Sequence, residues 1–144
     1  MAQEHFYQVD LKWKNGRVGE VSSPDLSTTI ECATPPEFES GVPNVWSPEH
    51  FYAAAINSCF MTTFLAIAEK SKVAFESFEA KTVIKLEILE KGFVISEAVI
   101  TPQVKLVDYD KDNERVLKVF EKTKKHCLVT NSMKTEVTVE PVVA

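Results

Sequence analysis

The longest apolar run in the chain covers residues 51–68, where no lysine or arginine occurs. Ser47 is a suitable N-cap before this run, Pro48 suits the first helical position, and Glu49 places an acid at the positive end of the helix dipole. A surface helix would carry a charged stripe, and this segment has none. The pattern therefore predicts a long central helix over residues 47–72 that is buried on nearly all sides.

Three segments before this helix show the alternation or the β-branched residues that are typical of strands. Residues 5–14 alternate imperfectly and lead into an Asn-Gly pair, which is a strong hairpin signal. Residues 17–21 form the predicted return strand, and residues 26–32 form the third strand. Residues 34–46 hold three of the seven prolines, so we expect an irregular loop that leads into the helix.

The chain after the central helix predicts a hairpin, a second helix and a last strand. Residues 77–90 and 93–107 alternate as strands around a Lys-Gly turn. Residues 110–125 begin acidic and end basic, as suits a helix dipole. Residues 134–142 form the last strand. We therefore expect a single α+β domain over residues 1–144, with curved antiparallel sheets packed on the buried central helix and on the second helix.

The composition is that of an ordinary soluble protein, and it excludes several partners. The 144 residues carry a net charge of −5, which provides no basic surface for nucleic acid or an anionic membrane. No signal peptide is visible, and polar residues at positions 57, 58, 62 and 63 interrupt the apolar run, so no membrane span is predicted. We expect a cytoplasmic protein, in which three cysteines are reactive or buried thiols rather than a disulfide framework.

Two of the three cysteines are candidates for thiol chemistry. Cys59 lies in the middle of the predicted central helix, and Cys127 lies at the end of the second helix beside His126. Free cysteines are among the most buried residues, so an inert core position is the simplest interpretation of either one. Two helices packed on one sheet can also bring the thiols together into a reversible disulfide, and the sequence leaves these alternatives open. Cys32, which ends a strand, is interpreted as structural.

Arg17 and Glu49 are further candidates, although charges after a hairpin turn or in a first helical turn are usually solvated. The histidines and cysteines lack C-x-x-C or H-x-x-x-H spacing, so no metal site is predicted. The four glycines stand singly, which excludes a glycine-rich phosphate loop, and no G-x-S-x-G nucleophile elbow occurs.

The segment PPEF…VWSPEHFYAAAINSCF, residues 35–60, resembles the OsmC/Ohr family of osmotically inducible protein C and organic hydroperoxide resistance proteins. Members of that family have a cysteine after a helix start of this form and a second cysteine near the end of a later helix. Residues 16–23, GRVGEVSS, are similar to the stretch that carries the family's arginine. The resemblance extends over essentially the whole chain in element order and length, and it implies an OsmC-like fold.

The resemblance implies thiol-dependent reduction of organic hydroperoxides without a cofactor or a metal. It assigns Cys59 as the peroxidatic cysteine, Cys127 as the resolving cysteine, and Arg17 with Glu49 as the activating pair. Attack on the peroxide leaves a sulfenic acid, which condenses with Cys127 to a disulfide. A dithiol, of the lipoyl type in the members that detoxify organic hydroperoxides, then reduces that disulfide. Many members have Cys-Pro at the second cysteine, whereas Leu128 follows Cys127 here.

Helix geometry adds a prediction about assembly. Glu49 and Cys59 are ten residues apart, which separates them by about 15 Å along one helix and roughly 80° around it. If both belong to one site, two antiparallel helices from two chains build it, so we predict an intertwined, isologous homodimer. Apolar surroundings favour alkyl or lipid hydroperoxides over hydrogen peroxide. The side chains predicted to bind the substrate are Phe51, Phe60, Met61 and Phe64.

Two other functions fit the same residues. A module that binds a hydrophobic ligand at the dimer interface would leave both cysteines idle, because a fold does not fix a function. A redox sensor would use the same disulfide for signalling and would lack fast turnover with a reductant. The sequence also leaves open whether the chain belongs to the Ohr branch, the OsmC branch or a third branch.

Overall fold

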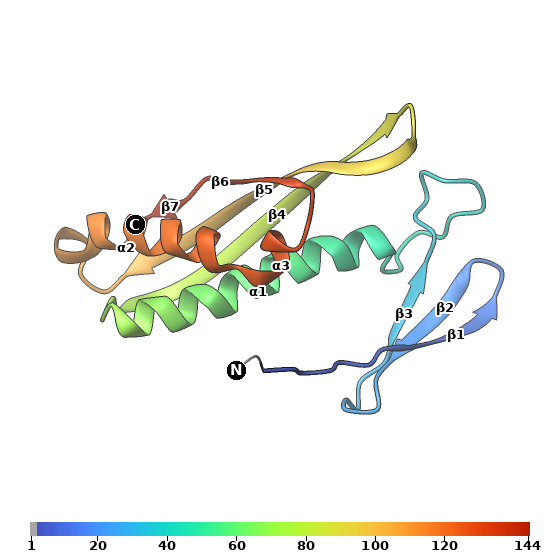
Figure 1. The fold of residues 1–144 in the computed structure, drawn as a ribbon, viewed down its shortest axis with the longest axis horizontal. Helices are drawn as coiled ribbons and strands as arrows, with labels where there is room; N and C mark the ends of the chain where they lie inside the picture. Colours follow the sequence, from blue (N-terminus) through green and yellow to red (C-terminus); the bar gives the residue numbers. More distant parts are fainter. Residues whose placement is uncertain (1–2) are drawn as a thin grey trace. The chain divides into compact units, whose positions relative to one another are not determined.

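The computed structural model describes residues 3–144, and the chain forms two compact units (Figure 1). The first unit extends to Phe51, and the second runs from Tyr52 to Ala144. Each unit has its own sheet, and most of the helical residues belong to the second unit. The α+β class is confirmed, whereas a single domain over residues 1–144 stays a prediction.

The first sheet is an antiparallel meander of three strands in the order β1-β2-β3. Its strands are β1 (Asp10–Asn15), β2 (Val18–Ser22) and β3 (Ile30–Ala33). The turn between β1 and β2 contains Gly16 at φ +48°, a left-handed conformation that glycine adopts without strain. The predicted Asn-Gly hairpin is therefore confirmed.

The boundaries of two strands differ from the prediction, because β2 is short. Its last residue, Ser22, pairs with Asp10, so the expected start of β1 at residue 5 is wrong. On the other side of β2, Val21 pairs with Ile30, and β3 begins there instead of at residue 26. A strand needs a partner for its ladder of hydrogen bonds, and alternation alone does not provide one.

The loop over residues 34–46 is irregular, as expected, and its own hydrogen bonds close it. The amide of Ala33 donates to the carbonyl of Trp46 at 2.8 Å, and the amide of Val42 donates to the carbonyl of Thr34 at 2.9 Å. The two ends of the loop are thereby held together directly before the helix that follows.

That helix, α1, covers Pro48–Lys70 and begins with a reciprocal cap. The amide of His50 donates to Ser47 Oγ at 3.3 Å, and the amide of Ser47 donates to His50 Nδ1 at 3.2 Å. This is the geometry of a capping box in which histidine replaces the usual glutamate or glutamine. The predicted N-cap is therefore confirmed.

Only one side of α1 is buried within the chain. The fully buried residues recur every fourth position, namely Ile56, Phe60, Phe64 and Ala68. On other sides Met61 and Leu65 are 39% and 40% exposed, so the expected burial on nearly all sides is wrong for a single chain. α1 is long and apolar enough to span a membrane, but its buried stripe belongs to the core of the second unit.

The second sheet is mixed, which corrects the expectation of purely antiparallel sheets. β4 (Phe75–Leu89) and β5 (Gly92–Leu106) form a long antiparallel hairpin, and β6 (Glu136–Val139) and β7 (Val142–Val143) pair with β5 in parallel. The reason is the crossover: a helical segment returns the chain to the same end of the sheet before β6 begins. Pro141 separates β6 from β7, so the single predicted last strand is divided.

The core of the second unit is built around Phe64 of α1. Its ring lies 4.7 Å from that of Phe78, 5.0 Å from that of Phe120 and 5.4 Å from that of Phe75, measured between centroids. These partners come from β4 and from α2 (Tyr109–His126), so one aromatic cluster fixes both helices against the hairpin (Figure 1).

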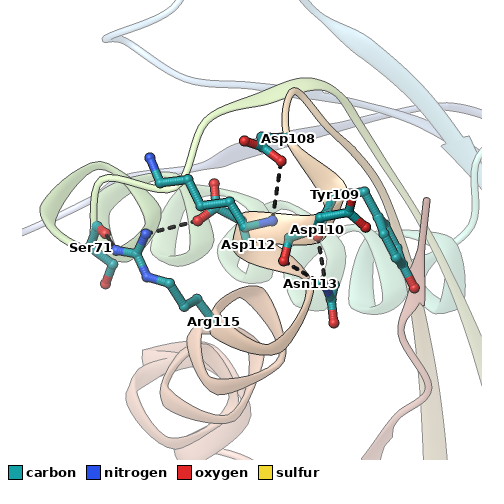
Figure 2. A network of polar contacts seen from close by, with 8 residues as sticks. Ser71, Asp108, Tyr109, Asp110, Asp112, Asn113 and Arg115 are labelled. Carbon is teal, nitrogen blue, oxygen red and sulfur yellow. Dashed lines mark hydrogen bonds and ion pairs between the residues drawn. The ribbon is translucent and has the colours of Figure 1, made fainter.

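A polar network fixes the start of α2 against the end of α1 (Figure 2). Asp108 caps α2 by accepting a hydrogen bond from the amide of Lys111 at 3.1 Å. One turn later the guanidinium of Arg115 bonds the buried carboxylate of Asp112 at 2.8 Å and also donates to the carbonyl of Ser71. These contacts fix the start of α2, and Cys127 follows directly after its other end, at His126.

Candidate active site

The structure brings Cys59 and Cys127 into contact. Cys59 lies on α1 and is half-buried, whereas Cys127 is fully buried between α2 and the short helix α3 (Leu128–Asn131). The Cys127 thiol lies near enough to Cys59 to be one of the groups that lower the pKa of Cys59, and both cysteines are free thiols. The juxtaposition that the sequence left open therefore exists within the second unit.

The surroundings favour the thiolate form of Cys59. Burial alone raises the pKa of this thiol, but hydrogen bonds from four groups outweigh burial and lower the pKa below its ordinary value. The four groups are the amide of Val129, the thiol of Cys127, the hydroxyl of Thr63 and the amide of Leu128. The side chain of Thr63 stands one helical turn from Cys59, with its Oγ1 4.0 Å from the sulfur. Cys59 therefore ionises more easily than an ordinary cysteine.

Cys127 has the opposite character. Burial raises its pKa, and the neighbouring charge of Cys59 raises it further, against a lowering by the hydroxyl and the amide of Thr130. Two neighbouring thiols cannot both ionise easily, so Cys59 is the one of the pair that loses its proton first. The basic residues before Cys127 are not among the groups that shift either pKa.

Arg17 and Glu49 both lie in the first unit, and the structure does not pair them. Arg17 is exposed and lines a hollow of about 260 Å³ together with Trp13, Cys32 and Pro48, among others. Glu49 has a buried oxygen, Oε2, that finds no hydrogen-bond partner among residues 3–144. An unsatisfied buried carboxylate oxygen is costly, so this group is poised to receive a donor.

The four apolar side chains predicted to bind the substrate lie in different environments. Phe60 and Phe64 have 0% exposure and pack in the core of this chain, and their role in substrate binding stays a prediction. Phe51 is half-buried and stacks on Trp46, with 5.8 Å between ring centroids. Met61 is exposed and lines a groove of about 290 Å³ on α1 and β4.

The residues that sequence reasoning missed are those that tune Cys59. Thr63 follows Cys59 by four positions, so helical periodicity alone could have identified it. The amides of Leu128 and Val129 carry no side-chain signal, because any residue supplies an N–H group. Within the described range, no group of three or more His, Cys, Asp or Glu side chains is arranged to hold a metal ion.

Residues 41–142 match the family model described as OsmC-like protein, which covers well over half of the chain. The chain therefore belongs to the OsmC-like family. No curated protein matches it at a significant level.

Solved structures agree in fold. An OsmC-like protein of unknown function from Vibrio cholerae is similar with a TM-score of 0.87 at 24% identity, over 96% of this chain and 100% of that one. An organic hydroperoxide resistance protein from Elizabethkingia anophelis has a TM-score of 0.76 at 18% identity, over 100% and 99% of the two chains. An organic hydroperoxide resistance protein OsmC from Legionella pneumophila has a TM-score of 0.71 at 22% identity, over 98% and 99%. The OsmC-like fold that the resemblance implied is therefore confirmed.

Proposed function

We propose that the protein is a cysteine-based peroxidase that reduces organic hydroperoxides. The observation that carries this proposal is the contact between Cys59, whose pKa is lowered, and Cys127, whose pKa is raised. A thiol peroxidase needs this difference in pKa between its two cysteines. The attacking sulfur must be a thiolate, and the resolving thiol supplies the proton with which the hydroxyl of the sulfenic acid leaves as water. The hydroperoxide resistance proteins of the same fold support this choice of reaction.

The reaction proceeds in two steps on the protein. The Cys59 thiolate attacks the distal oxygen of ROOH, the O–O bond breaks, and the alkoxide leaves and takes up a proton to give ROH. Cys59 is then a sulfenic acid. The Cys127 sulfur attacks the Cys59 sulfur, and the Cys59 hydroxyl leaves with the Cys127 proton as water. The product is a Cys59–Cys127 disulfide, formed while the peroxide gained two electrons.

Arg17 and Glu49 supply the charge that this reaction needs. In the proposal, Arg17 turns toward Glu49 and satisfies its buried Oε2 with a charge-assisted hydrogen bond. The oriented guanidinium then stabilises the thiolate and the departing alkoxide. Because α1 is continuous over Pro48–Lys70, helix geometry keeps Glu49 about 15 Å along the axis from Cys59 of the same chain. The Cys59 served by this pair therefore belongs to the partner subunit.

A homodimer also accounts for the large apolar side chains that are exposed to solvent in a single chain. Met61 and Leu65 lie exposed on α1, and Trp13 and Leu11 are 71% and 69% exposed on β1. A second copy of the chain would cover most of these surfaces, and Phe51 and Met61 at the edge of the interface would provide the apolar contacts for an alkyl or lipid hydroperoxide. We expect the enzyme in the cytoplasm, with a dithiol of the lipoyl type as reductant and no metal or cofactor.

The activity is tested by the consumption of cumene hydroperoxide with dihydrolipoamide or dithiothreitol. We expect turnover by the wild-type protein, loss of turnover in Cys59→Ser and a reduced rate in Cys127→Ser. Cys32→Ser is the matched control, because Cys32 lies in the first unit, and it should retain the wild-type rate. Absence of wild-type turnover with both dithiols would instead favour the hydrophobic-ligand module or the redox sensor.

Subunit mixing tests the shared site. Cys59→Ser and Glu49→Gln are each expected to lose most of their activity as pure proteins. After random exchange, half of the dimers contain one chain of each kind, and one of their two sites is then wholly wild-type. The mixture should recover about one quarter of the wild-type rate if each site takes its residues from two chains. No recovery would place Glu49 and Cys59 of the same chain in one site, whereas full activity of pure Glu49→Gln would show that Glu49 is dispensable.

A further inference from the structure

Tyr52 joins the start of α1 to the residue directly before β6. Its hydroxyl oxygen lies 2.5 Å from the Oγ1 of Thr135, and that Oγ1 donates to the carbonyl of Ile95 on β5 at 2.8 Å. A threonine hydroxyl has a single proton, and the carbonyl accepts it, so the phenol of Tyr52 is the donor to Thr135. Thr135 is buried, and solvent therefore competes little for these bonds. A directed chain of two hydrogen bonds runs from α1 through Thr135 to β5.

Tyr52 and Cys59 lie on the same face of α1. They are seven residues apart, which brings them to within about 20° of one another around the helix and separates them by about 10.5 Å along it. Residues 127–135 run back along this face in the opposite direction (Figure 1). The first residues of this segment, 127–129, lie beside Cys59, and its last residue bonds Tyr52. The segment and α1 therefore meet at two points, one at the cysteine and one at the tyrosine.

The other hydrogen bonds around α3 are local. The amide of Asn131 donates to the carbonyl of Cys127 at 3.0 Å, and the side chain of Asn131 donates to the carbonyl of Lys125 at 2.9 Å. These bonds fix the shape of α3 and its junction with α2. Val129 and Met133 pack against the core, but apolar contacts are not directional and do not fix the position of α3 along α1. The bond from the phenol to residue 135 is directional, and it acts at the end of the segment that is farther from the cysteines.

We infer that Tyr52 is a positioning residue of the candidate site: its hydroxyl group holds residues 127–135 in place along α1 and so keeps Cys127 and the start of α3 beside Cys59. Three of the four groups that lower the pKa of Cys59 belong to residues 127–129, and only Thr63 comes from α1 itself. Loss of the phenol hydroxyl should move this segment relative to Cys59 and weaken all three. The role of Tyr52 in peroxide reduction rests on the proposed function, whereas its effect on the Cys59 thiol does not.

The test is the pH profile of Cys59 alkylation by iodoacetamide, measured in a Cys32→Ser background. The tryptic peptide 18–70 then contains Cys59 as its only cysteine, so the mass of this peptide reports one thiol. Tyr52→Phe keeps the ring and removes the hydroxyl group. We expect alkylation in Tyr52→Phe to be about threefold slower on the rising limb of the profile, with an unchanged plateau at high pH, because about half a pH unit more is needed to ionise Cys59.

Further variants locate the effect. Thr135→Val should shift the profile at least as far as Tyr52→Phe, and the double variant should shift it no further than Thr135→Val, since both changes act through one hydrogen bond. Thr135→Ser keeps the hydroxyl group and should keep the wild-type profile. Thr82→Val is the matched control, because Thr82 Oγ1 donates to Asn57 Oδ1 at 2.8 Å and ties α1 to β4 only two residues from Cys59. Its profile should equal that of the wild type, whereas a general loosening of α1 would move it.

A wild-type profile in Tyr52→Phe, or an equal shift in Thr82→Val, would overturn the inference and leave Tyr52 an ordinary anchor of the fold. A lower plateau with an unchanged midpoint would overturn it as well, because that result indicates blocked access to Cys59 instead of lost positioning. A shifted profile in Tyr52→Phe, together with no consumption of cumene hydroperoxide by the wild-type protein, would contradict the proposed function and leave the positioning role standing.

Discussion

Replacing Phe64 with alanine separates a core role from a substrate-binding role. The side chain has no exposed surface, and its ring contacts three other aromatic rings at centroid distances of 4.7 to 5.4 Å. Removing a buried phenylalanine costs about 3–5 kcal/mol, and the loss of three ring contacts places this site at the upper part of that range. For a chain of this length, about 4 kcal/mol corresponds to a fall in Tm of roughly 8–16 °C.

The assay is urea unfolding followed by circular dichroism, at one fixed protein concentration because dimerisation would stabilise the folded state. Ile88→Thr is the control, since Ile88 is 75% exposed near the tip of the β4–β5 hairpin, and it should change the free energy of unfolding by less than about 0.5 kcal/mol. The milder Phe64→Leu should keep kcat/KM for cumene hydroperoxide within about twofold of wild type. A stability loss below about 1 kcal/mol in Phe64→Ala, or a selective rise of KM in Phe64→Leu, would refute the core assignment.

Three further changes have defined outcomes. Arg115→Met leaves the buried carboxylate of Asp112 unpaired and should lower the free energy of unfolding, measured in urea, by about 2–3 kcal/mol. The loss is smaller than for a fully buried ion pair because Arg115 is 44% exposed. An unchanged free energy of unfolding would contradict the network in Figure 2. Cys127→Ala removes a hydrogen bond that lowers the pKa of Cys59, so the pH profile of Cys59 alkylation should shift to higher pH, whereas Cys127→Ser, which keeps a donor, should shift it less. Ser47→Ala removes the N-cap of α1 and should cost about 1–2 kcal/mol by thermal unfolding, and an unchanged Tm would exclude a stabilising cap.

The elements of this fold could be predicted where local chemistry decides them. The Ser-Pro-Glu start of α1, the Asn-Gly turn and the acidic-to-basic gradient of α2 are local signals, and the structure has elements at each of these places. The starts of β1 and β3 could not be predicted, because they depend on how long β2 is. The parallel pairing of β6 depends on the path of the whole crossover, which no short window of sequence contains.

In the candidate site, too, some features could be predicted from local sequence and others could not. The two cysteines could be selected from their positions on two predicted helices, and Thr63 follows from helical spacing. The amides that lower the pKa of Cys59 belong to backbone at 128–129, and their orientation depends on the turn between α2 and α3. The burial of Phe60 and Phe64 could not be distinguished from a pocket lining, because both roles select large apolar residues.

The most direct test of the peroxidase is the intact mass of the reduced protein after one equivalent of cumene hydroperoxide. The account predicts a loss of about 2 Da in the wild-type protein, for a disulfide, and a gain of about 16 Da in Cys127→Ser, for a sulfenic acid. Cys59→Ser should keep its mass. A wild-type protein that keeps its mass, or a Cys59→Ser variant that is oxidised as fast as wild type, would contradict the assignment of Cys59 as the attacking thiolate.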